Sequence, residues 1–190
     1  FDEEGKPRWE MDLLLASQVV GPLLQQHRED VALWRFHRRA GNDATGHQFT
    51  VLVYTDAATG EALMGAAKSA SVVVALRRAG FVDGVVNTCR GELGQPALKA
   101  HSDPVWDERL EKTWPYFIMG VSAHWLALVD EVSRGRGEVP AAIEPMVEHY
   151  RAVQVELIEI WRFQGRHAYL HHLNAIFGYE PMLIQRFLGF

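Results

Sequence analysis

The sequence predicts an α+β protein, in which a small, three-stranded, mostly antiparallel sheet with crossing helices precedes an all-helical C-terminal half. Runs rich in β-branched and aromatic residues predict strands in the first half. In the second half, apolar residues recur every three or four positions, which is typical of helices. A segment with two glycines and two prolines, 91–104, separates the patterns. We therefore expect a mixed α/β subdomain at 1–90, a linker at 91–104 and a helical subdomain at 105–190, together forming one compact unit.

Two helices are expected around the strands of the first half. Apolar residues in 9–27 fall three or four positions apart, and the pair Gly21-Pro22 is expected to bend or restart that helix. The Ala-rich and Leu-rich stretch that ends near Arg78 predicts a second helix that crosses the sheet, with Gly80 just beyond its end.

The strand prediction depends on three short runs. Segments 31–36 and 49–54 are rich in β-branched and aromatic residues. The connection 41–46 holds Gly, Asn and Asp, which tolerate positive φ, so these two strands are expected to pair as an antiparallel hairpin. A third apolar run, 82–88, is broken by Gly84 and is expected to join one edge of the hairpin.

The second half predicts helices only. Pro115 suits the first turn of a helix that runs to about Val132. The longest helical pattern covers 140–174 and can pause at Gly165, and a last short helix is expected at 182–188.

Composition excludes several classes of function. With 19 basic and 24 acidic side chains, the formal net charge is −5, which disfavours nucleic acid as the main ligand. The longest uncharged stretches, 13–27 and 115–129, are too short and too polar to span a membrane, so we expect a soluble chain. The single cysteine, Cys89, permits no internal disulfide and suits a reducing compartment, from which we expect a cytoplasmic location.

Familiar catalytic and cofactor motifs are absent from the sequence. It contains no Gly-x-Ser-x-Gly nucleophile motif and neither of the common phosphate-binding glycine motifs. Cys89 is interpreted as a small buried hydrophobe rather than a nucleophile. No cofactor is therefore predicted.

A cationic corner is expected where the two hairpin strands meet the loop between them. His37, Arg38 and Arg39 end the first strand, and His47 precedes the second. Arginine grips a carboxylate with two parallel hydrogen bonds, so the cluster suits a carboxylate or an acidic peptide. The alternative is a hairpin tip that is simply solvated.

Three histidines, a carboxylate and an amide project into one arc if the helix at 140–174 is continuous: His149, Glu156, His167, His171 and Asn174. Apolar residues widen this arc, so the histidines are expected to face the core. The i, i+4 spacing of His167 and His171 suits two imidazoles on one metal ion, with His124 or His172 as candidates for a third ligand. The alternative, hydrogen-bonded histidines without metal, is the prediction adopted.

The order of these segments resembles the small thiopeptide-type, or glutamate-elimination, domain of lantibiotic dehydratases, which act on ribosomally synthesised, modified peptides. The similar segments are a helix with Gly-Pro-Leu-Leu at 21–24, a strand at 33–38, the stretch 46–51 and the late helical stretch 170–178. In that family the first strand ends in Phe-x-Arg-Tyr, the second opens with His-Leu-Arg-Leu-Arg, and the helix carries His-Met-x-x-Asn-Arg-Leu-x-Gly. The likeness spans nearly the whole chain.

The chain departs from this family at its functional positions. The two strand arginines that hold the glutamyl group fall on Phe49 and Val51, and the motif histidine falls on Leu170 unless a one-residue shift places it on His171. Two motif residues are retained, Arg38 and His47. Elimination needs a base and cations that stabilise the departing carboxylate, so these losses argue against that reaction.

The sequence therefore predicts a non-catalytic partner subunit in modified-peptide biosynthesis, for instance of the methanobactin type. It would bind a precursor peptide, a modifying enzyme or both in a hetero-oligomer, and an extended peptide could add to an exposed sheet edge. Two alternatives stay open. One is an elimination lyase with His171 or His167 as base and three anion-holding residues, Arg38, Arg39 and His47. The other is a metal protein built on the histidine stripe.

Overall fold

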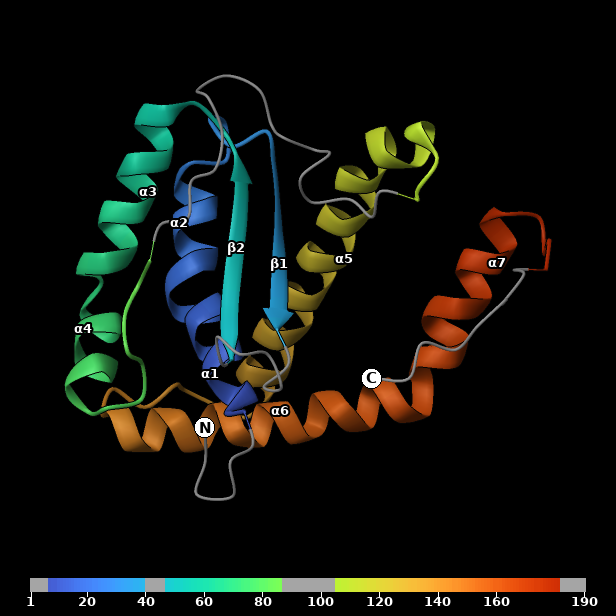
Figure 1. Ribbon diagram of the computed structural model, residues 1–190. Coiled ribbons are helices and arrows are strands. Elements are labelled where there is room, and N and C mark those ends of the chain that lie inside the picture. Colours follow the sequence, from blue (N-terminus) through green and yellow to red (C-terminus); the bar gives the residue numbers. More distant parts are fainter. Residues whose placement is uncertain (1–6, 40–46, 87–104, 182–190) are drawn as a thin grey trace. The chain divides into compact units, whose positions relative to one another are not determined.

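The computed structural model describes residues 7–39, 47–86 and 105–181 (Figure 1). Its contacts divide the chain into two compact units, Phe1–Gln154 and Val155–Phe190, here called the first and the second unit. The predicted linker, 91–104, lies outside the described residues, so the division proposed there stays a prediction. The fold is α+β and mostly helical, as expected from the sequence.

The elements of the first unit follow the predicted order of helix, hairpin and helices. They are α1 (Trp9–Leu15), η1 (Ala16–Val20), α2 (Gly21–Gln26), β1 (Leu33–Arg39), β2 (Gln48–Tyr54), α3 (Ala57–Ser69), α4 (Ser71–Arg78), α5 (Glu108–Gly135) and the larger part of α6 (Ile143–Gly165). Helix α6 passes from the first unit into the second.

The helix predicted at 9–27 consists of three successive pieces, because a π-helical turn, η1, separates α1 from α2. Pro22 has no N–H and cannot continue the α-helical hydrogen bonds, so the preceding turn widens. Gly21 permits the close packing at this junction, since a Cβ there would lie 3.2 Å from the Ala16 carbonyl oxygen. The predicted restart at Gly21-Pro22 is therefore observed.

The sheet has two antiparallel strands in the described part of the chain. The register pairs Leu33 with Tyr54 at one end and Arg39 with Gln48 at the other, which confirms the predicted hairpin pairing. The prediction of a third strand at 82–88 is wrong for residues 82–86, which have no regular structure. Residues 87–88 lie outside the described residues. Asp83 and Gly84 are poor strand formers that interrupt this short run.

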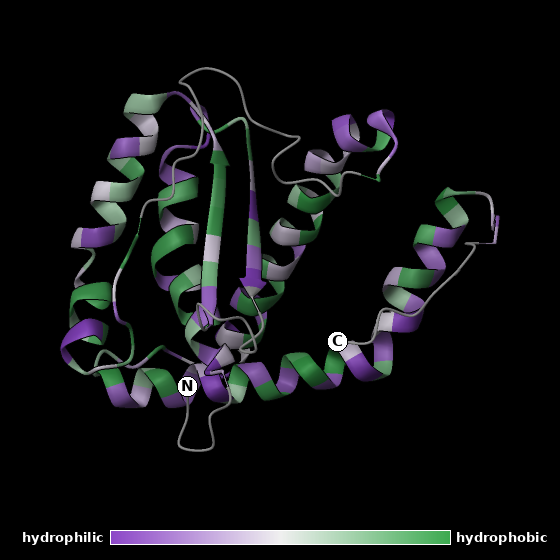
Figure 2. Cartoon of the chain, in the orientation of Figure 1, coloured by the Kyte–Doolittle hydropathy of each residue, from purple (hydrophilic) through white to green (hydrophobic). Residues whose placement is uncertain are grey.

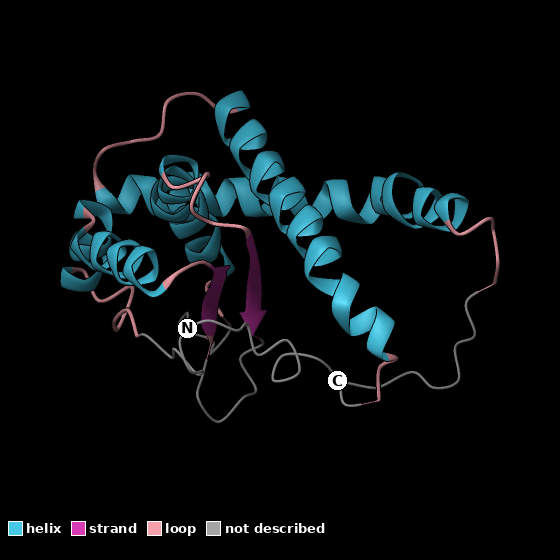
Figure 3. Ribbon diagram, turned by 90° about the horizontal axis from the view of Figure 1, so that it is seen from above, coloured by secondary structure: helices cyan, strands magenta, loops and turns pink. Residues whose placement is uncertain are grey.

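Helix α2 lies against one face of the sheet, and α5 runs obliquely past β1 (Figures 1 and 3). Apolar residues are prominent along α2 and β2 (Figure 2). The buried core centres on α1 and η1 and receives side chains from β1, α4, α5 and α6: Met11, Leu13, Leu14, Val19, Phe36, Val73, Leu76, Val129, Val132, Met146, Val147, Tyr150 and Val153. The α1–η1 segment is thus the element around which the first unit packs.

The described part of the second unit consists of the end of α6, the π-helical turn η3 (Arg166–His171) and α7 (His172–Ile176). The pause expected at Gly165 is the point where α6 ends and η3 begins. The Trp161 and Tyr169 rings stack there at 5.6 Å, and a Cβ on Gly165 would press on both. Gly178 and Tyr179, both with positive φ, follow the end of α7. The helix expected at 182–188 lies outside the described residues.

Candidate functional site

Asp12 is the centre of the polar cluster at the predicted cationic corner. This α1 residue is 1% exposed, and its two carboxylate oxygens bind different partners. Oδ2 accepts a hydrogen bond from Arg38 Nε at 2.7 Å, and Oδ1 lies 2.9 Å from His47 Nε2. Because an ionised carboxylate only accepts, His47 donates through Nε2. A buried carboxylate needs such partners, since its charge is otherwise left unsolvated.

The Arg38 guanidinium makes several further contacts in this cluster. Its Nη2 donates to the Trp9 carbonyl oxygen at 3.1 Å and to Gln154 Oε1 at 3.4 Å. Its Cζ lies 4.9 Å from the Trp9 ring and 5.1 Å from the Trp125 ring. Cation–π contacts of this kind favour arginine over lysine, because the planar guanidinium can stack and donate at once. The side chain therefore serves an internal role.

The structure brings together two of the four predicted corner residues, Arg38 and His47, and directs both onto Asp12. His37, the strand neighbour of Arg38, is exposed. The side chain of Arg39 lies outside the described part of the chain. Asp12 thus occupies the place of the carboxylate that the corner was predicted to take from a partner. The sequence signal for it was a lone acid within the apolar run from Met11 to Leu15.

Helix α5 covers the outer edge of β1 at Phe36. This contact matters because an added peptide strand would have to pair with that edge. The Phe36 N–H donates to Ser122 Oγ at 3.1 Å, and this hydroxyl donates onward to the Ile118 carbonyl oxygen at 2.7 Å. The Phe36 ring packs against Trp125 at 5.4 Å and Phe49 at 5.3 Å. A peptide could not use this N–H without displacing α5.

A second polar network ties η1 to α5 and α6. The Ser17 hydroxyl donates to Asp130 Oδ1 at 2.6 Å and accepts from the fully buried Tyr150 hydroxyl at 2.9 Å. Gln18 Nε2 donates to the same Tyr150 oxygen at 2.6 Å. The hydrogen bonds satisfy a buried phenol and join three helices, which is a structural role. Sequence analysis missed this network, because its members are far apart in the chain.

His149 lies beside this network and contacts Ser133, with 2.8 Å between Nε2 and Oγ. Burial lowers the pKa of His149, and the nearby positive charge of Arg136 lowers it further. Both effects favour the neutral form of His149. It belongs to the stripe predicted on the long helix, but it serves the packing of α5 and α6 within the first unit.

The other histidines of the predicted stripe lie on the π turn of the second unit. His167 and His171 are exposed, so the expectation that they face the core is wrong. The π turn changes the angle between successive residues, so a stripe drawn for one continuous α-helix ends at Gly165.

His172 joins these two histidines. The His167 and His171 rings are parallel within 7° with centroids 5.0 Å apart. The His172 ring stands at 87° to both, at 5.5 and 5.2 Å. His124, the other candidate for a third ligand, lies on α5 in the first unit. Within the described ranges, no three His, Cys, Asp or Glu side chains are arranged to hold a metal ion as they stand.

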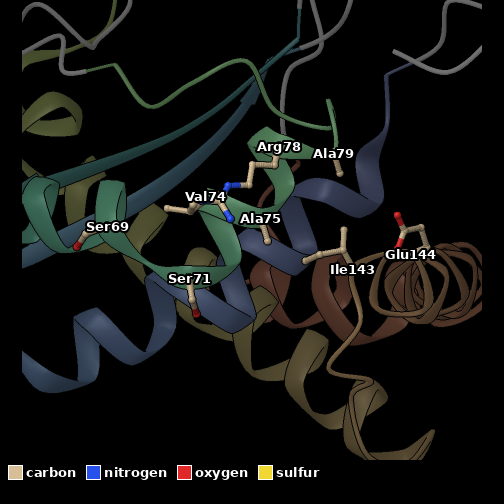
Figure 4. Close-up of a pocket in the computed structure, with 8 residues that line it drawn as sticks. All are labelled: Ser69, Ser71, Val74, Ala75, Arg78, Ala79, Ile143 and Glu144. Carbon is tan, nitrogen blue, oxygen red and sulfur yellow. The ribbon is translucent and has the colours of Figure 1, made fainter.

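An open depression of about 620 Å³ lies between α4 and the start of α6 (Figure 4). It is lined by Ser69, Ser71, Val74, Ala75, Arg78, Ala79, Ile143 and Glu144. None of the predicted site residues lines it. Arg78 and Glu144 are its charged residues, and their chemistry points to no reaction.

The comparisons with known proteins give no match: no family model fits the chain, and neither a curated protein nor a solved structure resembles it. The resemblance to the thiopeptide-type domain therefore stays a prediction. In the described segments, no helix combines the length and apolar character that crossing a bilayer requires.

Proposed function

We propose that this protein is a non-catalytic partner subunit that binds another polypeptide during the biosynthesis of a ribosomally synthesised, modified peptide, for instance of the methanobactin type. The polypeptide is a modifying enzyme, a precursor peptide or both. The pathway is an expectation from the resemblance alone. The binding role is supported by one observation, the exposed apolar side chains of the second unit.

Most large apolar side chains in the described part of the second unit are exposed or half-buried. Those more than half exposed have exposed fractions between 57% and 84%: Val155, Trp161, Phe163, Leu170, Ile176, Phe177 and Tyr179. Among the described residues of this unit, Leu157 is the one buried apolar side chain. Short helices in water depend on packing an apolar face, so a segment without its own core needs a surface to cover it. We take these exposed apolar residues to mark the contact with the partner.

The pairing of Arg38 and His47 with Asp12 supports a binding role over an elimination reaction. Arg38 and His47 are both engaged by Asp12, so neither is available to stabilise a departing carboxylate without breaking that pair. The lyase alternative would depend on His171 or His167 as base and on Arg39 as the remaining anion holder. An active lyase would lose turnover but little peptide affinity on His171→Ala, whereas a binding subunit has no turnover to lose.

The mode of binding we favour is contact through a helix face. Strand addition at β1 is opposed at Phe36, whose N–H is already bonded to Ser122. Aromatic residues such as Trp161 and Phe163 are the side-chain types that most often dominate binding energy at protein interfaces. Their exposure on a helix suits insertion into a partner's apolar groove.

Co-expression with the enzyme and precursor peptide encoded by neighbouring genes tests this proposal. The affinity-tagged chain should retain one of them through purification. Phe163→Glu should lower the amount retained by about tenfold or more, because a charge replaces an apolar anchor. Gln164→Glu is the matched control, since it adds the same charge at the next exposed position of the same helix.

Elution of the wild-type chain alone would contradict the binding role. Equal retention by wild type and Phe163→Glu would show that the partner uses another surface, and would contradict the role assigned to the second unit.

A further inference from the structure

The histidine cluster on η3 and α7 is a chemical feature that the proposed function does not use. Three imidazoles, those of His167, His171 and His172, lie within 5.0 to 5.5 Å of one another, measured between ring centroids. All three residues are exposed. The cluster lies entirely within the second unit.

The π turn explains why a third histidine joins the i, i+4 pair. In an α-helix, His172 would lie roughly 140° around the axis from His167, at 100° per residue. In a π turn the hydrogen bonds run from residue i to i+5, so residue 172, directly after the turn, lies closer to residue 167 around the axis than it would in an α-helix. π turns are costly and occur frequently at functional sites. The local backbone thus assembles the cluster.

A hydrogen bond sets the protonation pattern of His172. Its Nδ1 lies 3.0 Å from the His167 carbonyl oxygen. A carbonyl only accepts, so Nδ1 carries the hydrogen, and in the neutral ring Nε2 is the acceptor nitrogen. The bond also holds the His172 ring across the two parallel rings.

We propose that His167 and His171 together bind one late first-row divalent transition-metal ion, such as Zn²⁺, with His172 as a positioning residue. Imidazole nitrogen is a preferred ligand of zinc, copper and nickel. Two imidazoles four residues apart on one helix face can reach one ion, which requires nitrogen–metal distances of about 2.0 to 2.1 Å. The parallel rings at 5.0 Å are close enough for small side-chain rotations to bring one nitrogen of each onto the ion.

The remaining coordination positions of this site are open. No third donor in the described segments converges with this pair as the side chains stand, so water or a donor from a bound polypeptide completes the shell. Sites with open positions are the kind that accept an exogenous ligand. The proposal concerns the purified chain and holds or fails independently of the proposed function.

Zinc titration of the purified chain by calorimetry, in a buffer that does not chelate metals, tests the proposal. Wild type should bind one equivalent. His167→Ala and His171→Ala should each weaken binding by more than about tenfold, because loss of an outer-shell partner alone already costs about 10- to 100-fold at metal sites. His27→Gln, at a histidine of the first unit, is the control and should bind zinc as wild type does.

The positioning role of His172 has its own readout. His172→Ala should weaken zinc binding by less than the two ligand variants do, and His172→Asn should restore it, because the amide can donate to the same carbonyl. Nitrogen NMR shifts of the imidazoles should change on zinc addition at His167 and His171. Far-UV circular dichroism should show that each variant keeps its helices.

Three results would overturn the proposal. One is wild-type zinc binding weaker than about 1 mM, which corresponds to roughly 4 kcal/mol. Another is unchanged affinity in both His167→Ala and His171→Ala. The third is a loss of zinc affinity in His27→Gln as large as in His167→Ala and His171→Ala. Phe163→Glu should bind zinc normally, so failure of partner binding and failure of metal binding are distinguishable.

Discussion

The two units of this chain differ in what their polar and apolar side chains contact. In the first unit, one carboxylate, that of Asp12, is buried and paired with Arg38 and His47. In the second unit, imidazoles and aromatic rings such as Phe163 face solvent, and the apolar residues alternate with hydrophilic ones along the ribbon (Figure 2). The difference supports the proposal that the second unit contacts another molecule, while the first unit contains most of the buried core.

The largest effect should come from removing the carboxylate at the centre of the first unit. Asp12→Ala leaves Arg38 and His47 without their shared acceptor, and breaking a buried ion pair from one side costs about 3 kcal/mol. Urea denaturation measures the free energy of unfolding. Glu159→Ala, at an exposed acid of the second unit, is the control and should change it by less than about 0.5 kcal/mol. If both variants changed the free energy of unfolding by similarly small amounts, the proposed difference between the two units would be contradicted.

A smaller loss of folding stability is expected from a substitution at Ser122, where α5 covers the edge of β1. Ser122→Ala leaves the Phe36 N–H without its acceptor, and an unsatisfied buried donor costs about 1 to 3 kcal/mol. The same denaturation experiment should show a lower midpoint with an unchanged slope. If the stability stays at the wild-type value, the β1 edge is not closed by Ser122, and strand addition there becomes tenable again.

His149 in the first unit should make the folding stability depend on pH. Burial lowers the pKa of His149 below its unfolded value of 6.5, so at mildly acidic pH the unfolded chain binds more protons than the folded one. This contribution to stability is therefore complete well above pH 6.5 and is lost as the pH falls below it. Unfolding midpoints measured between about pH 5 and 8 should decrease on the acid side. His149→Gln should flatten that dependence, and an equally steep curve in this variant would assign it to other groups.

Phe163→Glu should have the smallest effect on folding stability and the largest effect on partner binding. Phe163→Glu exchanges an exposed side chain, so the free energy of unfolding should change by no more than about 0.5 kcal/mol. A drop of several kcal/mol in the isolated chain would mean that Phe163 packs within its own molecule. The second unit would then not be the contact surface that we propose from its exposed apolar residues.

Local patterns predicted much of the fold but little of the site. The hairpin was predictable, because strand residues and a Gly-rich and Asn-rich connection act over a few positions. The third strand at 82–88 was not, because an apolar run only becomes a strand when a partner edge accepts it. At the site, Arg38 and His47 were correctly expected to lie close together, but the carboxylate that holds them was not identified.

By itself the sequence determined the hairpin, the order of helices around it and the presence of a histidine-rich late helix, because those follow from backbone preferences and the spacing of apolar residues. The tertiary structure alone decided that Asp12 would neutralise the corner, since it lies 26 residues from Arg38 and 35 from His47 in the chain. It also decided the grouping of His172 with His167, because a single widened turn changes which residues share a face. Both outcomes depend on where helices widen and cross, which local sequence preferences do not specify.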